Sequence, residues 1–154
     1  MDRSLIEQYA AGGAVPAELI RGLSAAHLDA HPEPGRWSIR EVVVHLMDSD
    51  LVGADRMKRV IAEDRPSLPA YDQDAFLARL GYYQTDPAVA AELFALNRRH
   101  MATILRRLPD DAFRRVGVHS ENGPMTLEQL VGVYVGHVEH HARFARRKRE
   151  LLGK

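Results

Sequence analysis

The sequence predicts an all-α protein, a four-helix bundle with one long crossover between its second and third helices. Three observations indicate this fold class: four tracts have apolar residues at helical spacing, two tracts open with a capping box, and proline and glycine residues separate them. The chain of 154 residues has a length typical of one compact core, so residues 1–154 are expected to form one domain.

The N-terminal part is expected to hold a short helix over residues 4–10, ended by Gly12 and Gly13, and then the first long tract. This tract begins at Pro16, because proline suits the first turn of a helix. The tract is expected to stop near residues 31–32, before a turn formed by the Pro-Gly pair at 34–35. Its apolar stripe consists of Leu19, Ile20, Leu23, Ala26 and Leu28.

The second tract has the clearest start, since Ser38 is a good N-cap and Glu41, three residues later, completes a capping box. Its apolar stripe continues to residues 60–61, and the helix is expected to end before Pro66. His45 lies on the flank of that stripe, one residue from its centre.

Residues 65–85 form the long connection, with prolines and a glycine around an expected short helix over residues 72–79. Its length indicates a crossover that lets the second and third helices run parallel. The third helix is expected to start with Asp86 as its cap and Pro87 in its first turn. Its predicted apolar stripe is Val89, Leu93, Leu96 or Asn97, His100 or Met101, Ile104 and Leu108.

Residues 116–124 are expected to form a loop with brief extended pairing. Thr126 and Gln129 then make a second capping box, which opens the fourth helix over residues 126–150. A basic cluster near its end is interpreted as a solvated helix terminus, because cations suit the C-terminal end of a helix. The cluster consists of Arg143, Arg146, Arg147, Lys148 and Arg149.

The composition argues against several classes of protein. The 21 basic and 21 acidic side chains give a formal net charge of zero, so no nucleic-acid partner is expected. No apolar run reaches the ~18 residues of a membrane span, and the N-terminus lacks the plan of a secretory signal. We therefore expect no membrane partner and a cytoplasmic location. The chain has no cysteine, which excludes disulfides, thiolate metal sites and a thiol nucleophile of its own.

Two histidines interrupt the apolar stripe of the fourth helix. His137 and His141 are four residues apart, so both rings face the same side, where a buried imidazole needs a polar partner. A metal ion is one such partner, and His45 is the best-placed third ligand. Three neutral nitrogens would leave one coordination position open, as in catalytic zinc sites, and nickel suits the same ligands. Hydrogen-bonded core histidines are the alternative, which the spacing alone leaves open.

Signatures of other sites are absent from the sequence. Neither order of the zinc-protease motif occurs, and no Glu-x-x-His pair of the di-iron bundles is present. The chain also lacks a G-x-S-x-G elbow and a glycine-rich phosphate loop.

Several motifs occur along the chain in a fixed order. Trp37 and a capping serine precede a His-Leu-x-Asp-Ser run at residues 45–49, followed by Arg56. Further on come residues 69–72, residues 119–123 and a closing Tyr-x-x-His-x-x-His-His pattern at 134–141. Over about residues 16–152, this set resembles the DinB-like superfamily, and more narrowly its YfiT-like branch.

The resemblance implies a four-helix bundle that binds one divalent metal ion through His45, His137 and His141. Members are commonly homodimers labelled as metal-dependent hydrolases, and those with established activity transfer or use low-molecular-weight thiols such as bacillithiol, mycothiol or glutathione. The chain departs from the pattern at Gly136, where relatives often carry a bulky residue, and at Asn97, where they often carry histidine. Both departures could reshape the pocket, so the substrate is not carried over.

Four other residues are candidates for supporting the metal ligands or the substrate, each with an ordinary structural alternative. Asp48 could orient a ligand or be a solvated helix residue, and His140 could support the site or lie on the surface. Arg56 could hold a substrate carboxylate or form an ordinary salt bridge, and Tyr71 could offer a hydroxyl or simply pack. No catalytic residue is assigned beyond the three proposed ligands.

The expected function is a metal-dependent enzyme that transfers an exogenous low-molecular-weight thiol to an electrophilic small molecule. The metal would be zinc or nickel and the protein a homodimer. A hydrolase using metal-bound water is the first alternative, because a three-histidine zinc brings the pKa of bound water to about 7. The second alternative is a non-catalytic metal- or ligand-binding dimer.

Overall fold

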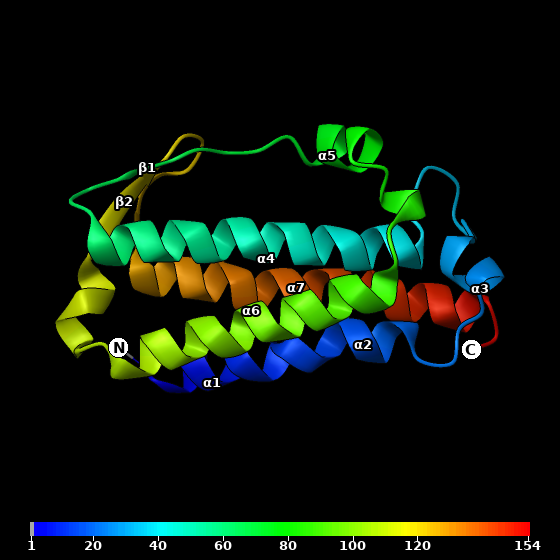
Figure 1. Cartoon of the computed structure of the whole chain (residues 1–154), viewed down its shortest axis with the longest axis horizontal. Coiled ribbons are helices and arrows are strands. Elements are labelled where there is room, and N and C mark those ends of the chain that lie inside the picture. Colours follow the sequence, from blue (N-terminus) through cyan, green and yellow to red (C-terminus); the bar gives the residue numbers. More distant parts are fainter. Residues whose placement is uncertain (1) are drawn as a thin grey trace.

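The computed structural model describes residues 2–154, and its long helices lie side by side along one axis (Figure 1). The predicted all-α bundle is confirmed. Its helices are α1 (Ser4–Ala11), α2 (Val15–Ile20), α3 (Ala25–Asp29), α4 (Ile39–Ala62), α5 (Gln73–Arg79), α6 (Pro87–Arg107) and α7 (Leu127–Leu151). Short 3-10 turns cover Gly12–Ala14, Tyr82–Gln84 and Asp110–Arg114.

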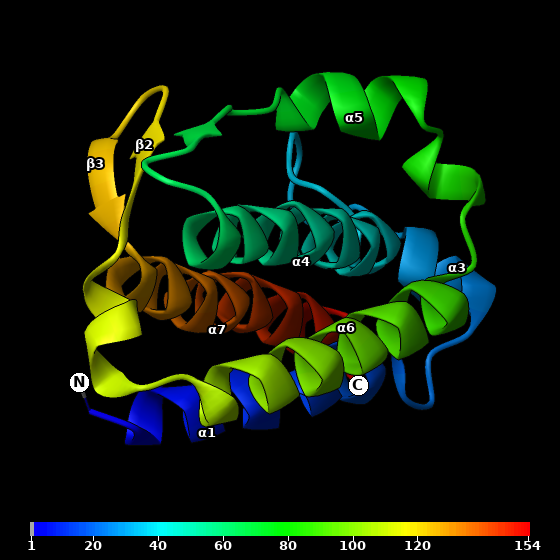
Figure 2. The ribbon, with the colours of Figure 1, turned by 60° about the vertical axis from the view of Figure 1, so that its left-hand side comes forward.

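The connection between α4 and α6 is the predicted crossover. After α4 the chain runs back along the whole bundle, through α5, before α6 begins near the start of α4 (Figures 1 and 2). The helices α4 and α6 are therefore parallel, and α7 runs in the opposite direction beside α4. This arrangement places the first half of α4 next to the second half of α7.

The N-terminal segment differs from the prediction. Gly12 and Gly13 do not end the helix, since α1 continues through the 3-10 turn into α2. The break comes later, at Gly22, whose φ of +72° is a left-handed conformation that favours glycine. Gly12 has a different role, because a Cβ there would collide with the guanidinium of Arg98. The glycine pair thus allows close packing rather than a turn.

Both predicted capping boxes are present. Ser38 Oγ accepts from the Glu41 amide at 3.2 Å, and the Glu41 carboxylate accepts from the Ser38 amide at 2.6 Å. Thr126 and Gln129 make the same reciprocal pair at 3.1 and 2.8 Å. These bonds satisfy amides that the first turn leaves without helical partners, and so fix where α4 and α7 begin.

A small sheet lies at the end of the bundle where α4 ends (Figure 2). The extended pairing expected within residues 116–124 is present and is longer than predicted, as a hairpin of β2 (Val116–His119) and β3 (Gly123–Thr126). A third strand, β1 (Ser67–Leu68), pairs parallel with β2 and was not predicted. Two-residue strands carry too little alternation to be recognised in a sequence.

The apolar stripe predicted for α6 is right only in part, since Met101 is buried and Ile104 and Leu108 pack against the core. Val89 is 60% exposed, while Phe94 and Leu105, which the predicted stripe leaves out, are buried. Arg98 causes the error, because it lies on this inner face with 1% exposure. A buried arginine breaks the rule that charges point outward, and the structure provides its partners.

Arg98 is the centre of a buried polar network that joins the long helices. Its Nε donates to Asp50 Oδ1 of α4 at 2.9 Å, and its two Nη atoms donate to the carbonyls of Tyr9 and Tyr134 at 3.2 and 2.6 Å. Asn97 donates to Asp50 Oδ2 at 2.8 Å. Segments from α1, α4, α6 and α7 are thereby fixed at one level of the bundle.

Within residues 2–154, none of the helices combines the length and the apolar character needed to cross a lipid bilayer.

Candidate metal centre

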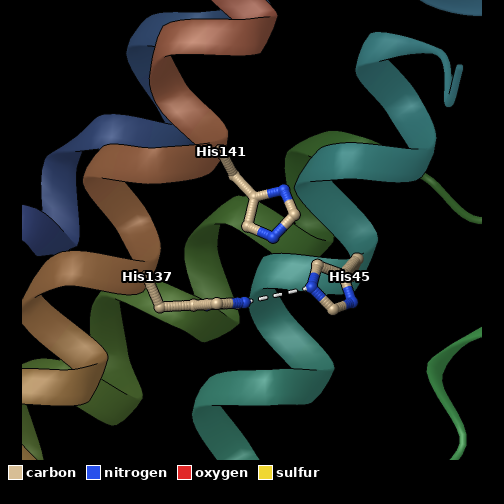
Figure 3. Close-up of side chains that lie close together, drawn as sticks. All are labelled: His45, His137 and His141. Carbon is tan, nitrogen blue, oxygen red and sulfur yellow. Dashed lines mark hydrogen bonds between the residues drawn. The ribbon is translucent and has the colours of Figure 1, made fainter.

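Three histidines from two helices meet inside the bundle (Figure 3). His45 comes from α4, and His137 and His141 come from α7. One ring nitrogen of each lies within 4.8 Å of those of the other two. The Nε2 atoms of His45 and His137 are 3.2 Å apart, and the His141 ring lies above this pair (Figure 3).

The helices determine this arrangement. Four residues make just over one helical turn, so His137 and His141 lie on one helix face. Their rings meet edge-on, with centroids 4.6 Å apart. The antiparallel packing of α4 against α7 then brings His45 to 4.7 Å from the His141 ring. Trp37, just before α4, packs edge-on against His45 at 4.8 Å. Trp37 therefore covers the site, a contact that its sequence position did not reveal.

Burial keeps the three imidazoles neutral. Desolvation is the main reason that the pKa falls to about 3 for His45 and His137 and to about 4 for His141. Repulsion between the neighbouring rings lowers each pKa further. At neutral pH every ring has a free lone pair, which is the form that binds a metal ion.

The donor set fits a divalent metal ion. Zinc–imidazole bonds of about 2.0–2.1 Å at tetrahedral angles place two ligand nitrogens roughly 3.3 Å apart. The 3.2 Å between the Nε2 atoms of His45 and His137 matches that spacing. The same contact is a hydrogen bond between the rings when no ion is bound. His45 Nδ1 is buried and has no hydrogen-bond partner among residues 2–154, so this ligand lacks the acceptor that commonly orients a metal-bound histidine.

A cavity of about 300 Å³ adjoins the cluster at His141. It lies between the start of α4, the start of α5 and the second half of α7. Its walls include Trp37, Val42, Asp74, His140, His141 and Lys148. Because His141 belongs both to the cluster and to the wall, a small molecule in the cavity can reach the cluster.

Two of the predicted supporting residues, Asp48 and Arg56, bind the crossover rather than the histidines. Asp48 Oδ2 accepts from the Tyr82 hydroxyl at 2.6 Å. Arg56 donates to the Tyr134 hydroxyl at 3.0 Å and to the Pro69 carbonyl at 2.6 Å. These bonds hold residues 69–82 against α4 and α7.

Tyr71, on the same crossover, packs against Phe76 with ring centroids 4.8 Å apart. Burial raises the pKa of its hydroxyl, and the nearby Ser49 side chain lowers this pKa to a smaller extent. His140 is the predicted supporting residue that touches the cluster, because its exposed ring meets the edge of His141 at 5.3 Å.

The two departures from the family pattern do not shape the cluster. A Cβ at Gly136 would meet no atom within 4 Å, so a larger residue there would extend into open space. Asn97 belongs to the Asp50 network, where its amide donates to both the carboxylate and the carbonyl of Asp50.

Lys148 was predicted to belong to a solvated helix end, but the structure buries its side chain. It is 2% exposed, while its neighbours Arg146 and Arg147 are exposed. The spacing contained the signal, because Lys148 is seven residues after His141 and therefore on the same helix face.

Sequence comparison identifies relatives of this chain. The family described as the DinB superfamily matches residues 8–145. "Putative metal-dependent hydrolase YfiT" of Bacillus subtilis is 31% identical over 131 residues, covering 82% of this chain and 74% of that protein. A protein of Oceanobacillus iheyensis, also named "Putative metal-dependent hydrolase", is 29% identical over 119 residues, covering 77% and 69% of the two chains.

Solved structures share the fold. YfiT of Bacillus subtilis, described as having "an unusual four-helix bundle topology", superposes with a TM-score of 0.91 at 26% identity, over 97% of this chain and 86% of that one. A mycothiol-dependent maleylpyruvate isomerase superposes with a TM-score of 0.71 at 12% identity, over 92% of this chain and 59% of that one. At that identity the likeness extends to the fold alone.

Proposed function

This chain belongs to the DinB superfamily, and from that premise we propose that it is a metal-dependent enzyme with a three-histidine centre. His45, His137 and His141 would hold one divalent ion, zinc or nickel. The observation that carries the proposal is the convergence of three neutral imidazoles beside a cavity of about 300 Å³. Core histidines that served only packing would not need access to a cavity.

The proposed reaction is the transfer of a low-molecular-weight thiol to an electrophilic small molecule. A divalent ion with an open position lowers the pKa of a bound thiol or water. A new carbon–sulfur bond forms on the substrate, and the thiol proton passes to solvent or to the departing group. The chain has no cysteine, so the sulfur must come from a second small molecule.

The residues of the chain have defined parts in this proposal. His141 joins the cluster to the cavity, where both reactants would be brought together. Trp37 packs against His45 and limits the access of water from that side. The isomerase with the same fold, which depends on mycothiol, supports a thiol as co-substrate.

Hydrolysis is the second candidate, and the names of the sequence relatives favour it. A hydrolase of this type needs a group that takes a proton from water. Glu139, the acidic residue within the histidine motif, is exposed and 4.0 Å from Arg146. Asp48 is held by the Tyr82 hydroxyl. Neither of these two carboxylates lines the cavity, and Asp74, which does, is the base that hydrolysis would need. The thiol dependence of the isomerase with the same fold keeps thiol transfer as the first candidate.

Two measurements test the proposal. Elemental analysis of the purified protein should find about one divalent ion per chain, and this ion should be lost in His45→Ala but kept in His140→Ala. Metal-loaded protein should then convert a generic electrophile only when a thiol is added. Turnover on ester or amide panels without thiol would favour hydrolysis. Metal binding without any turnover would indicate a non-catalytic metal-binding protein, and retention of metal in His45→Ala would overturn the site.

The homodimer and the cytoplasmic location remain predictions of the family resemblance and the sequence, and light scattering of the purified protein tests the first.

A further inference from the structure

The side chain of Lys148 is buried, and its ammonium group has no partner among residues 2–154. The residue is only 2% exposed. Its ammonium nitrogen is not among the fully buried unpaired atoms, so the little exposure that remains includes the charged end, at the cavity that the residue lines. Removing a charge from water destabilises the protein unless another group compensates for it. A helix of this length could place lysine on its outer face without that cost, as it does with Arg143 and Arg146.

The nearby carboxylates are already engaged elsewhere. Glu33 accepts from Arg147 at 3.1 Å, and Glu41 accepts from the Ser38 amide at 2.6 Å as part of the cap of α4. Both raise the pKa of Lys148 from a distance, but burial lowers it more, and Arg36 lowers it as well. The protein therefore leaves the charge on this lysine incompletely compensated.

Lys148 lines the same cavity as His141. The two residues are seven positions apart on α7, which is two helical turns or roughly 10 Å along the axis. Phe144, between them, also lines the cavity and offers an apolar surface. A molecule lying along this wall would have one end at the histidine cluster and the other at the lysine.

The other charged groups of the cavity leave an excess of positive charge. Arg36 faces it beside Lys148, and Asp74 at the start of α5 faces it with the opposite sign. His140 and Gln73 add polar groups that can donate hydrogen bonds. Two cations against one carboxylate favour an anionic ligand, and the buried lysine is the cation with the least access to water.

We propose that this cavity binds the carboxylate end of a small anionic reactant, with Lys148 as the residue that holds the carboxylate. The inference rests on the proposed function, because the reacting end of the same molecule would lie at His141. It names the class of reactant: a flexible or elongated small molecule whose carboxylate is on the order of 10 Å or less from its reacting group. The carboxylate belongs either to the thiol or to the electrophile.

Trp37 provides the readout. It is the one tryptophan of the chain and lines the cavity, so its fluorescence reports a ligand there without any turnover. The full chain is titrated with hexanoate and with hexanol, which match in length and differ in charge. Both titrations are run with chelator present and again after zinc loading.

Hexanoate should bind on the order of tenfold more tightly than hexanol, the difference expected for a charge-assisted hydrogen bond. Lys148→Met should abolish the preference. Arg143→Met is the matched control, because it removes an exposed cation from the same helix end and should keep the preference. Asp74→Asn is an independent variant that leaves Lys148 in place, and it should strengthen hexanoate binding two- to threefold by removing a like charge.

Equal binding of hexanoate and hexanol by the wild-type protein would overturn the proposal. Equal losses in Lys148→Met and Arg143→Met would also overturn it. Failure of the metal centre would show separately, as absence of zinc from the wild-type protein, since the chelator arm does not involve the ion.

A second pair of probes distinguishes the two sources of the carboxylate. In zinc-loaded protein, 6-mercaptohexanoate is compared with hexanoate. Much tighter binding of the mercapto acid indicates that one molecule supplies both the sulfur and the carboxylate. Equal binding assigns the carboxylate to the electrophile.

Discussion

The Nε2 atoms of His45 and His137 lie 3.2 Å apart, although 92 positions separate the two residues in the chain. This contact joins the first half of α4 to the middle of α7, and it exists because the two helices are antiparallel neighbours. A metal ion bound there would cross-link two helices of the bundle, with consequences for stability as well as for chemistry.

Metal should stabilise the wild-type protein strongly. A ligand present at 100 times its dissociation constant stabilises the folded state by about 2.7 kcal/mol when the unfolded chain does not bind it. Addition of zinc or nickel to chelator-treated protein should therefore raise Tm by several degrees, as followed by circular dichroism. His137→Ala should abolish the shift and His140→Ala should keep it. An equal shift in both variants would show that the ion binds elsewhere.

The metal-free protein should lose stability as the pH falls below about 6.5. The unfolded chain takes up protons on these histidines near pKa 6.5, whereas the folded pKa is about 3 for His45 and about 4 for His141. The stability that comes from keeping these histidines neutral is thus fully present above pH 6.5. It is lost progressively as the pH falls from 6.5 toward the folded pKa values. Urea midpoints measured from pH 7.5 to 4 in chelator should decrease.

His141→Gln provides the comparison for that pH dependence, because it removes one titrating group and should flatten the decrease. Asp50 acts in the opposite direction, since burial raises its pKa, but it is common to both proteins and cancels in the difference. Parallel pH profiles for the two proteins would contradict the assignment of the acid sensitivity to the cluster.

Breaking the buried pair of Arg98 and Asp50 should cost about 3–5 kcal/mol, because the remaining charge would be buried without a partner. The two residues are 1% and 2% exposed, so solvent screens them little. Asp50→Asn should therefore lower the free energy of unfolding sharply in urea titrations. The double variant Arg98→Met, Asp50→Asn should be less destabilised than the sum of its single variants, and strict additivity would argue against the pair.

Gly53→Ala should be destabilising although it lies inside a helix. A Cβ at this position would overlap the ring of Tyr134, and overpacking of this kind typically costs 1–3 kcal/mol. Gly132→Ala in α7 is the matched control, because nothing lies within 4 Å of its Cβ position. The control should be stabilised by roughly 0.5–1 kcal/mol, the usual helix preference for alanine over glycine. Chemical denaturation of both variants measures the contrast, and equal effects would contradict the close contact.

The sequence alone determined the helices with strong local signals. The capping boxes at Ser38 and Thr126 predicted where α4 and α7 begin, because such bonds form between residues three positions apart. The same local geometry placed His137 and His141 on one face. The length of the segment after α4 was enough to predict the crossover, since a short loop cannot join parallel helices.

The tertiary structure decided what depends on residues distant in the chain. Arg98 could be assigned to the inner face of α6 only through Asp50, 48 positions away, so the inner face of that helix was predicted only in part. The Gly12–Gly13 pair was taken for a helix end because the guanidinium packed against it comes from another helix. Lys148 was counted with its exposed neighbours, because the cavity that it lines exists only where α4, α5 and α7 meet. Local periodicity determines which residues share a helix face. Which face is buried, and which side chains meet there, depends on how the helices pack, and local sequence patterns do not reveal that packing.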